Sequence, residues 1–471
     1  MYAEAASIPS AVDFQISTLI SKFPHSQISK SRRCYLPRVP QAPLEAAVLR
    51  RVTRRLVGFA FICYVIAYID RVNIGFAAAA LQRDLGLSDT AYGLGAGLFF
   101  LGYCLFEVPS NLLLERIGAR RWIARIMIAW GIVSMGMMFV HDTASFYAAR
   151  VLLGIAEAGF FPGMVLYFTY WVPAAERART GALFMMAAPI AIIVGSPVSE
   201  ALLSLDGRGG LAGWQWLFLL EGAPAVILGI AALFVLTDRP EQATWLPPAE
   251  RDWLAQTMSA ERQARATHGA HTIAAALRSP KVWQLAAVYF LNTLVTYGVF
   301  LWLPRMLREL SGTTGWRLSA LTAVPFVAAL IGMLVIGRHS DRTRERKRHV
   351  AACALTAACG LLLASWFSSV LPLFIVSFTL SQVGQRSVMS VFWAIPPIVL
   401  AGPAAAAGIA LINAIGNLGG FVGPSVMGWL RDTTGGYAGG LLVLAAALLI
   451  EAALVLTVKL PAPPAAAQPR E

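Results

Sequence analysis

Four charged side chains stand inside two long apolar segments, where charge is expensive and marks pathways or pairs. Asp70 and Arg71 are adjacent in one segment, and Arg150 and Glu157 lie in another. A carboxyl group can bind and release a proton, whereas a guanidinium offers a planar fork that matches a carboxylate. This combination indicates chemistry in which an anion and protons are bound together.

Each of these four residues is given a predicted role. We expect Asp70 and Glu157 to carry protons, Arg71 to bind the anion, and Arg150 to tune an acid or assist. Arg150 and Glu157 are two helical turns apart and so share one face of a helix. The alternative is static pairing, in which the acids and arginines only stabilise packing.

The second half of the chain contributes polar and aromatic side chains instead of an acid–arginine pair. Asn amides can donate to a carboxylate or accept from a hydroxyl, and Tyr or Trp can flank a sugar acid or an aromatic ring. Ordinary packing or interhelical hydrogen bonding is the alternative for each. The candidate substrate contacts from the residues themselves are Tyr289, Tyr297, Ser390, Trp393, Asn413 and Asn417.

Two further buried charges are assigned less directly. Glu107 precedes Pro109 in the second apolar segment, which favours a structural or latch role. Arg386 lies in the middle of the tenth segment, and two uses stay open for it. It serves either as a second contact to an anion or as a side chain that reaches the interface or a backbone carbonyl.

The elements that must position these residues follow from composition. The chain has 471 residues, 57% hydrophobic and 13% charged, whereas soluble proteins carry about 25% charged residues. Most of its surface therefore faces lipid, where backbone groups must bond internally, so we predict an all-α polytopic membrane protein. The expected spans are 56–79, 91–114, 122–140, 144–169, 181–204, 214–236, 281–303, 318–337, 349–367, 371–399, 404–428 and 438–458.

Loop charge predicts the orientation of the chain. Loops rich in arginine, such as the one with Arg120 and the one with Arg342, are expected in the cytoplasm together with both termini. The loop with Arg305, Arg308 and Arg317 is an exception on the outer side. The expected parts are a disordered cytoplasmic tail 1–50, a six-helix bundle 51–236, a cytoplasmic linker 237–280, a second bundle 281–460 and a cytoplasmic tail 461–471.

Two cytoplasmic loops repeat one pattern, an acid beside an arginine with more basic residues about four positions on. The residues are Glu115, Arg116 and Arg120 in the first half, and Asp341 and Arg342 in the second. Internal repeats are typical of secondary transporters. Such ion pairs could close one bundle against the other in one state of a cycle.

Six further strings of the sequence are informative together: YIDRVNIG (68–75), EVPSNLLLERIGARRW (107–122), RVLLGIAEAGFFPG (150–163), WLFLLEG (216–222), FWAIP (392–396) and GIALINAIGNLGGFVGP (408–424). With them the chain resembles the major facilitator superfamily, and within it the anion:cation symporter branch of tartrate, phthalate, hydroxyphenylacetate and sugar-acid transporters. The resemblance covers about residues 50–460. It implies two six-helix bundles around a central cavity that the first and fourth helices line, with substrate bound by Tyr103, Ser390, Trp393 and Asn417 and protons by Asp70 and Glu157.

What the resemblance implies is proton-coupled uptake of a small organic anion across a bacterial inner membrane. A tartrate-like hydroxy acid or sugar acid is favoured, and an aromatic acid comes next. An exporter, a passive facilitator or a transporter-fold sensor are the alternatives. We expect a monomer that meets protons, the anion and lipid but no nucleic acid. No enzyme activity, cofactor or metal is expected, since the five cysteines lack ligand spacing and no nucleotide loop occurs.

Overall fold

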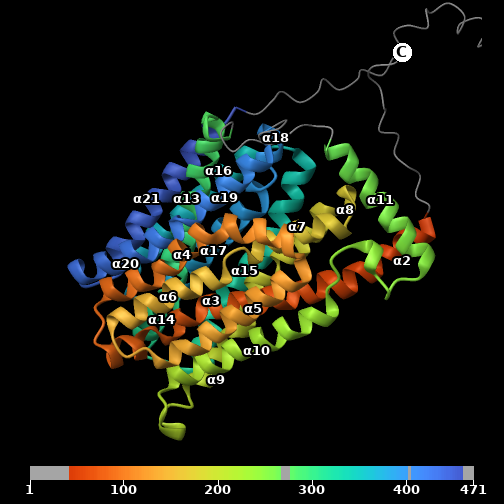
Figure 1. Ribbon diagram of the computed structural model, residues 1–471. Helices are drawn as coiled ribbons and strands as arrows, with labels where there is room; N and C mark the ends of the chain where they lie inside the picture. The colour runs from red at the N-terminus through yellow and green to blue at the C-terminus, as the bar shows by residue number, and fades with distance from the viewer. Residues whose placement is uncertain (1–41, 267–275, 401–404, 460–471) are drawn as a thin grey trace, which may run out of the picture. The chain divides into compact units, whose positions relative to one another are not determined.

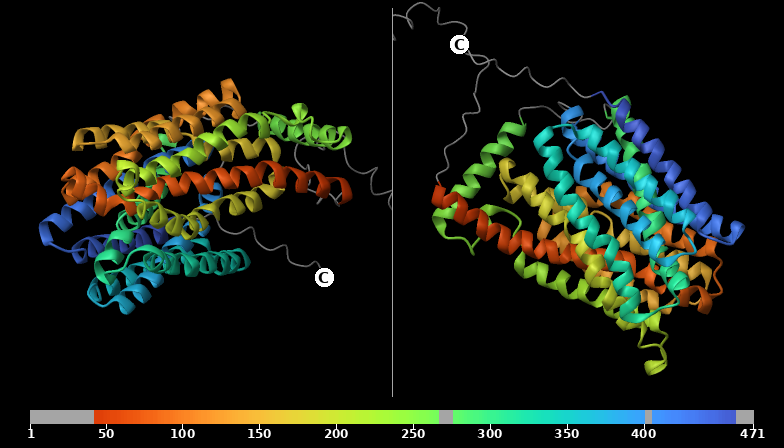
Figure 2. Two further views of the ribbon diagram at one scale, coloured as in Figure 1. Left: turned by 90° about the horizontal axis from the view of Figure 1, so that it is seen from below. Right: turned by 180° about the vertical axis from the view of Figure 1, so that it is seen from behind.

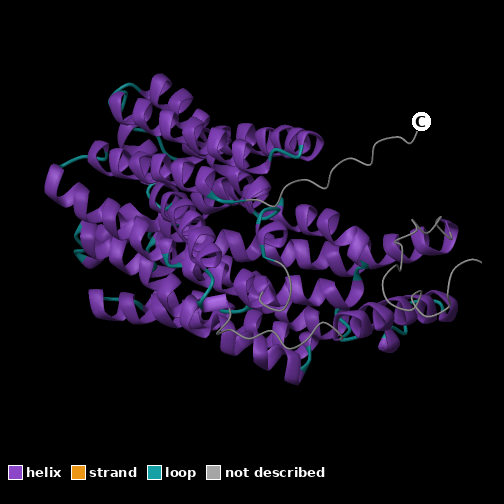
Figure 3. Cartoon of the chain, turned by 90° about the horizontal axis from the view of Figure 1, so that it is seen from above, coloured by secondary structure: helices purple, strands orange, loops and turns teal. Residues whose placement is uncertain are grey.

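The computed structural model describes residues 42–266, 276–400 and 405–459, and these ranges are helical without a strand (Figure 3). The first half of the chain is built from long helices with short connections. They are α2 (Ala42–Val52), a π-helical turn (Thr53–Val57), α3 (Gly58–Leu85), α4 (Asp89–Ile117), α5 (Ala119–Gly136), α6 (Thr143–Glu157), α7 (Phe160–Trp171), α8 (Ala174–Met185), α9 (Ala187–Leu203) and α10 (Gly213–Val235).

The second half follows a helical linker. The linker contains a 3-10 turn (Pro240–Gln242) and α11 (Pro248–Ala266). The remaining helices are α13 (Pro280–Phe300), α14 (Leu303–Ser311), α15 (Gly315–Thr343), α16 (Arg346–Trp366), α17 (Leu371–Phe392), α18 (Pro396–Val399), α19 (Ala405–Asn417), α20 (Gly419–Thr434) and α21 (Ala438–Thr457).

Within the described residues, eleven helical spans are long and apolar enough to cross a membrane. The predicted tenth span is not among them, although α17 is 22 residues long and packs between α15 and α16. Gln382, Gln385 and Arg386 are strongly hydrophilic, and all three are buried within the protein. The polytopic all-α fold is confirmed, and α17 differs from the other spans because its polar side chains face protein.

The predicted disordered tail is wrong for its last residues. Helix begins at Ala42, and a continuous helical segment runs from Leu44 to Leu85. Val48, Val52 and Leu56 are buried, so this extension has an apolar face of its own. Residues 1–41 and 461–471, the rest of the two expected tails, lie outside the described residues.

The spans of each half lie side by side, and the two halves face each other (Figures 1 and 2). They meet along α4 and α20 and along α9 and α15. The α4–α20 contact is a seam of backbone against backbone. A Cβ atom on Gly93 would stand 2.4 Å from the Pro424 carbonyl oxygen, and one on Gly97 would stand 2.5 Å from that of Phe421. Only glycine permits this approach.

The fourth span is broken in its middle, directly after Glu157. Helix α6 ends there, Ala158 has ψ of 131°, and Gly159 has φ of +87° before α7 begins at Phe160. A side chain on Gly159 would also meet the Ser110 hydroxyl at 2.3 Å. The break leaves Glu157 at a helix end, aimed by a backbone conformation that favours glycine.

The start of this span is fixed by a local cap. Asp142 accepts hydrogen bonds at Oδ1 from the Ser145 backbone N–H at 2.7 Å and from the Ser145 hydroxyl at 2.6 Å. Ser145 in turn accepts from the Asp142 N–H at 3.1 Å. This reciprocal box satisfies backbone donors that the first helical turn leaves free.

Candidate transport site

The guanidinium of Arg71 joins three helices at the centre of the candidate site. On one side Nη2 donates to Oε1 of Glu157, the last residue of α6. On the other side Nη1 donates to the Tyr297 hydroxyl of α13 at 3.2 Å. Arg71 lies on α3, so one cation binds an acid of its own half and a phenol of the opposite half.

Aromatic rings enclose the same guanidinium. Its Cζ lies 5.6 Å from the ring centre of Tyr68, 5.2 Å from Phe99 and 5.3 Å from Tyr103. Such rings attract a cation through their negative faces and exclude water from it. The structure thus brings together Arg71, Glu157 and two of the predicted substrate contacts, Tyr103 and Tyr297.

Asp70 lies apart from this pair. Its carboxylate accepts from the Trp130 indole at 2.5 Å, the Ser134 hydroxyl at 2.6 Å and the Asn73 amide at 3.1 Å. All three donors belong to α3 or α5 of the first half. Consecutive residues of a helix point about 100° apart, so Asp70 bonds within the first bundle while Arg71 reaches the second, although the charges of Asp70, Glu157 and Arg150 still act on one another.

Arg150 is fully buried beside α4. It donates to the carbonyl oxygens of Ala96 at 3.1 Å and Gly95 at 3.4 Å, and it stacks on Phe99 with a separation of 5.2 Å. Among the described residues it forms no hydrogen bond to Glu157, although the two share a helix face. Arg150 therefore reinforces the contact between α4 and α6. It lies next to the aromatic cage of Arg71, the name we give to the rings of Tyr68, Phe99 and Tyr103.

Glu107 connects the two halves on α4. It accepts from the Asn413 amide of α19, and the Asn417 amide lies 3.5 Å from its second oxygen. The Cys104 thiol also reaches the Ala414 carbonyl oxygen at 3.3 Å. Asn413 and Asn417, which the sequence suggests for substrate binding, here donate to an acid of the opposite bundle. Such a contact between bundles is what a latch role of Glu107 requires.

The remaining predicted contacts cluster in the second half. Tyr289 stacks on Phe392 at 5.7 Å and meets Trp393 edge-on at 5.0 Å. The Trp393 indole N–H is buried without a hydrogen-bond partner in the described part of the chain. Ser390 donates to the Ser387 carbonyl oxygen at 2.8 Å. Tyr289, Phe392 and Trp393 thus pack in the apolar core of the second half, where the Trp393 donor has no partner among the described residues.

Ion pairs tie the two halves together at the end of the molecule where α4 begins. Arg431 of α20 contacts Asp89 of α4 at 2.9 Å, and Arg305 of α14 contacts the same carboxylate at 2.5 Å. Asp432 accepts from the Asp89 and Thr90 backbone N–H groups at 3.1 and 2.7 Å. We call Asp89, Arg305, Glu309, Arg431 and Asp432 the end network.

A second tie lies beside it. Arg308 donates to Glu200 at 2.7 Å, and the Gly315 N–H donates to the other oxygen of Glu200 at 2.9 Å. Sequence analysis placed Arg305 and Arg308 as an exception to the charge bias. Their acid partners on α4 and α9 explain the exception, because both charges are neutralised across the interface. The sequence does contain acids at the ends of other spans. Which arginine each acid pairs with depends on the fold, so the sequence alone could not predict these ion pairs.

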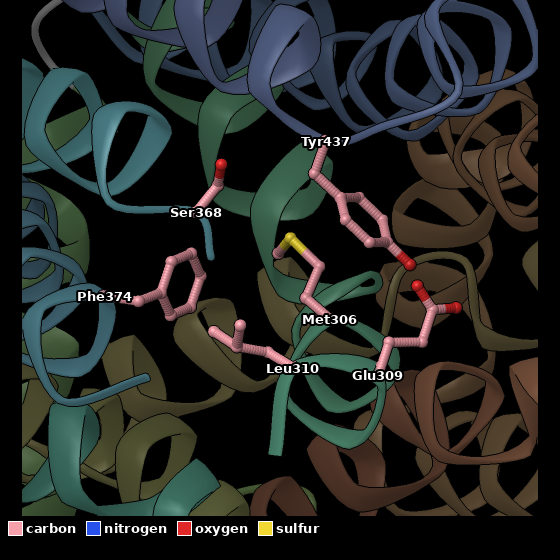
Figure 4. A pocket seen from close by; sticks show the side chains of 6 residues that line it. All are labelled: Met306, Glu309, Leu310, Ser368, Phe374 and Tyr437. Carbon is pink, nitrogen blue, oxygen red and sulfur yellow. The ribbon is translucent and has the colours of Figure 1, made fainter. Parts of the chain in front are cut away.

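A pocket of about 210 Å³ lies next to the end network (Figure 4). All its lining residues belong to the second half, so it is separate from Arg71. Burial raises the pKa of Tyr437, so its phenol stays neutral at physiological pH. The lining residues are Met306, Glu309, Leu310, Ser368, Phe374 and Tyr437.

The repeated loop motifs occupy the opposite end and bond within their own half. Asp341 pairs with Arg346 at 2.5 Å. In the first half, the Arg120 backbone N–H is capped by Asp238 at 2.8 Å, which the sequence motif did not single out. Glu115, Arg116 and Arg342 form no ion pair between the halves in the described residues. Among the residues that the structure describes, this end thus shows no ion pair between the bundles like those of the other end.

The guanidinium of Arg71 can exchange its bound acid, Glu157, for the negative group of another molecule. A proton on Glu157 would remove the charge that holds Arg71, and a negative group could take its place within the aromatic cage. Among the described residues, no group of three His, Cys, Asp or Glu side chains is placed to hold a metal ion.

Residues 60–364 and 310–471 match the sequence profile of the Major Facilitator Superfamily. A relative from Agrobacterium vitis, named as a tartrate transporter, is 52% identical over 88% of this chain and 91% of its own length. A quinolone resistance transporter of Acinetobacter baumannii is 41% identical over 88% and 94%. The xylose transporter XylE from E. coli, in a partially occluded inward open conformation, has a TM-score of 0.69 at 13% identity, covering 86% and 97%.

Proposed function

Because the chain belongs to the major facilitator superfamily, we propose that it takes up a small organic anion with protons by alternating access. A tartrate-like hydroxy acid or sugar acid is the favoured substrate, which the similarity to the protein named as a tartrate transporter supports. The chain is a multi-pass membrane transporter of small molecules. The proposal adds the anion, the protons and the direction.

One observation carries the proposal, the sharing of Arg71 between Glu157 and Tyr297. While Glu157 is ionised, it neutralises the guanidinium and competes with any external carboxylate. When Glu157 binds a proton, the neutral acid no longer competes, and the anion can bind the planar fork. Proton and anion then favour each other's binding, which is the thermodynamic basis of symport.

Asp70 is proposed as the second proton carrier. It has three neutral donors and no ion-pair partner among the described residues. A proton can therefore enter or leave without breaking a salt bridge. Because the Asp70 donors lie on α3 and α5, its protonation changes the packing of the first bundle only, whereas that of Glu157 changes a contact between bundles.

The closed end is proposed to face the outside. The end network and the Glu200–Arg308 pair lie on the side that loop charge predicts to be outer, and the arginine-rich loops lie opposite. In this assignment the structure is closed to the outside, with Glu107 and its asparagine partners partway toward the cytoplasm. Uptake then requires the end network to open and the halves to rock about the cage.

The test is uptake into proteoliposomes with and without an inward proton gradient. Labelled tartrate, galactonate, phthalate and 4-hydroxyphenylacetate are compared for the wild type and Glu157→Gln. We expect one anion to accumulate only with the gradient. Glu157→Gln should lose accumulation by at least tenfold and keep exchange of labelled for unlabelled anion, since the anion site survives without the titrating group.

Glu451→Gln is the matched control. Glu451 is another fully buried glutamate of a membrane span, but it lies on α21 and accepts from the Asn292 amide at 3.2 Å, away from the cage. Glutamine can keep that bond, so accumulation should stay near the wild-type level. Uptake that ignores both the gradient and Glu157→Gln would make the acids structural and would refute coupling.

Export is the second candidate. The relative named as a quinolone resistance transporter favours it, because its 41% identity extends over most of both chains. The same vesicles decide between the two directions. An exporter would use the proton gradient to expel label from preloaded vesicles, whereas the proposed importer would accumulate label against its gradient.

A further inference from the structure

Arg386 is a buried cation that lacks an anionic partner. It lies on α17 with 7% of its surface exposed, and among the described residues it forms no ion pair and no hydrogen bond. Its Nε is enclosed and unpartnered. An isolated charge inside a membrane protein is strongly unfavourable and marks a functional position.

Two aromatic rings lie next to the Arg386 guanidinium. Its Cζ lies 5.7 Å from the ring centre of Phe300 and 5.4 Å from that of Phe326. Rings on α13 and α15 therefore stabilise the charge, while the N–H groups in the guanidinium plane stay free to donate. This is the geometry that a carboxylate can engage with two parallel hydrogen bonds.

Arg150 shows what a structural arginine looks like in the same molecule. It is fully buried and also lies next to a phenylalanine, but its Nε and Nη2 donate to the Gly95 and Ala96 carbonyl oxygens, and only its Nη1 lacks a partner among the described residues. The buried acid of the second half, Glu451, accepts from Asn292 and does not pair with Arg386. The need of Arg386 for an acceptor is therefore unmet by the described residues.

Arg386 and Arg71 border one turn of the same helix. Tyr297, which accepts from Arg71, and Phe300, which stacks on Arg386, are three residues apart on α13. That spacing corresponds to a rise of about 4.5 Å on nearly the same face. Two guanidiniums, one from each half, thus lie beside side chains of the same turn of α13.

We infer that the substrate is a small dianion, with one carboxylate bound by Arg71 and the other by Arg386. This inference rests on the proposed function and names its substrate class, a short dicarboxylate. A monocarboxylate of the same skeleton would occupy Arg71 and leave Arg386 uncompensated. Because each arginine belongs to a different half, the dianion also joins the two bundles when they close around it.

The test compares acids that differ only in the second carboxylate. Tartrate and threonate share a four-carbon hydroxylated skeleton, and galactarate and galactonate share a six-carbon one. Binding to purified protein in detergent is followed by titration calorimetry, and uptake is measured in proteoliposomes. The wild type should prefer the dicarboxylate of the transported pair by about tenfold or more, the scale of one charge-assisted contact.

Arg386→Gln should lower affinity for the dicarboxylate by ten- to a hundredfold and leave that for the monocarboxylate within about twofold. Retained monocarboxylate binding shows that the variant is folded. Arg386→Lys, which keeps the charge without the fork, should fall between. Arg317→Gln removes an exposed arginine of α15 and should change neither affinity.

Three results would overturn the inference. Equal loss of both acids in Arg386→Gln would assign the residue to folding, and no change in either would leave it without a ligand. A wild type that prefers the monocarboxylate would refute the dianion while leaving proton-coupled uptake intact. Failure of the wild type to bind or transport any acid of the panel would instead refute the proposed function itself.

Discussion

Asp70 and Glu157 are both buried carboxyl groups of the first half, yet their surroundings differ in kind. Asp70 accepts from three neutral donors of its own bundle, whereas Glu157 neutralises a cation that also contacts Tyr297 of the other bundle. A proton on Asp70 is therefore a local event, and a proton on Glu157 changes what holds the bundles together. Burial alone does not distinguish the two roles; the partner does.

Glu157→Gln should separate the two acids most strongly. In the wild type, ionised Glu157 competes for Arg71, so anion affinity should weaken as pH rises. The variant removes the competitor, and its affinity should be about tenfold higher than the wild type at pH 8 and nearly independent of pH. Calorimetric titration between pH 5.5 and 8.5 measures both. A slope equal to that of the wild type would contradict the exchange of partners.

Asp70→Asn should act on coupling and stability but not on affinity. The amide presents donors to Trp130 or Asn73 where an acceptor is required, which costs about 1–3 kcal/mol of folding stability. Thermal unfolding in detergent measures that loss, and the pH dependence of anion affinity should stay as in the wild type. Asp206→Asn, an exposed acid of a loop, serves as the control. An altered affinity profile would place Asp70 with Arg71 after all.

Arg431→Ala tests the contact between bundles that does not involve the cage. The variant loses the ion pairs to Asp89 and Glu309, about 1–3 kcal/mol for partly buried groups, so the network end should open more often. A cysteine at Ser425 in the seam should then react several times faster with an impermeant maleimide. Arg317→Ala is the control, and an unchanged rate would show that the seam alone keeps this end closed.

Asp142→Asn should have the smallest effect. Hydrogen bonds from Ser145 lower the pKa of Asp142, so its charge stabilises the fold above the ordinary Asp pKa of about 4 and that contribution is lost as pH falls through the lowered value. Unfolding temperatures at pH 7 should drop by less than about 2 °C, and the difference should vanish near pH 3. A difference that persists at pH 3 would mean that asparagine weakens the cap itself.

Sequence identified the fold because its signals are local. Apolar runs of about 20 residues and arginine-rich loops give spans, and the repeats give two bundles. It also selected Arg71, Glu157, Tyr103 and Tyr297, which the structure brings together. It could not separate Asp70 from Arg71, since the facing of adjacent residues depends on how the helix is packed. The partners of Glu107 and of Arg305 were equally out of reach, because they lie more than 200 residues away.

The seam between α4 and α20 has a consequence for how quickly the two halves can part. Gly93 and Gly97 present backbone to the carbonyl groups of Pro424 and Phe421, so closing this surface immobilises few side-chain rotamers. Little conformational entropy is then gained or lost at these two contacts, although the Phe100 ring of α4 also packs against Gly420 of α20. The backbone contacts can therefore separate and form again in the same register in every transport cycle. The ion pairs of the end network then determine how often the two halves separate at this end.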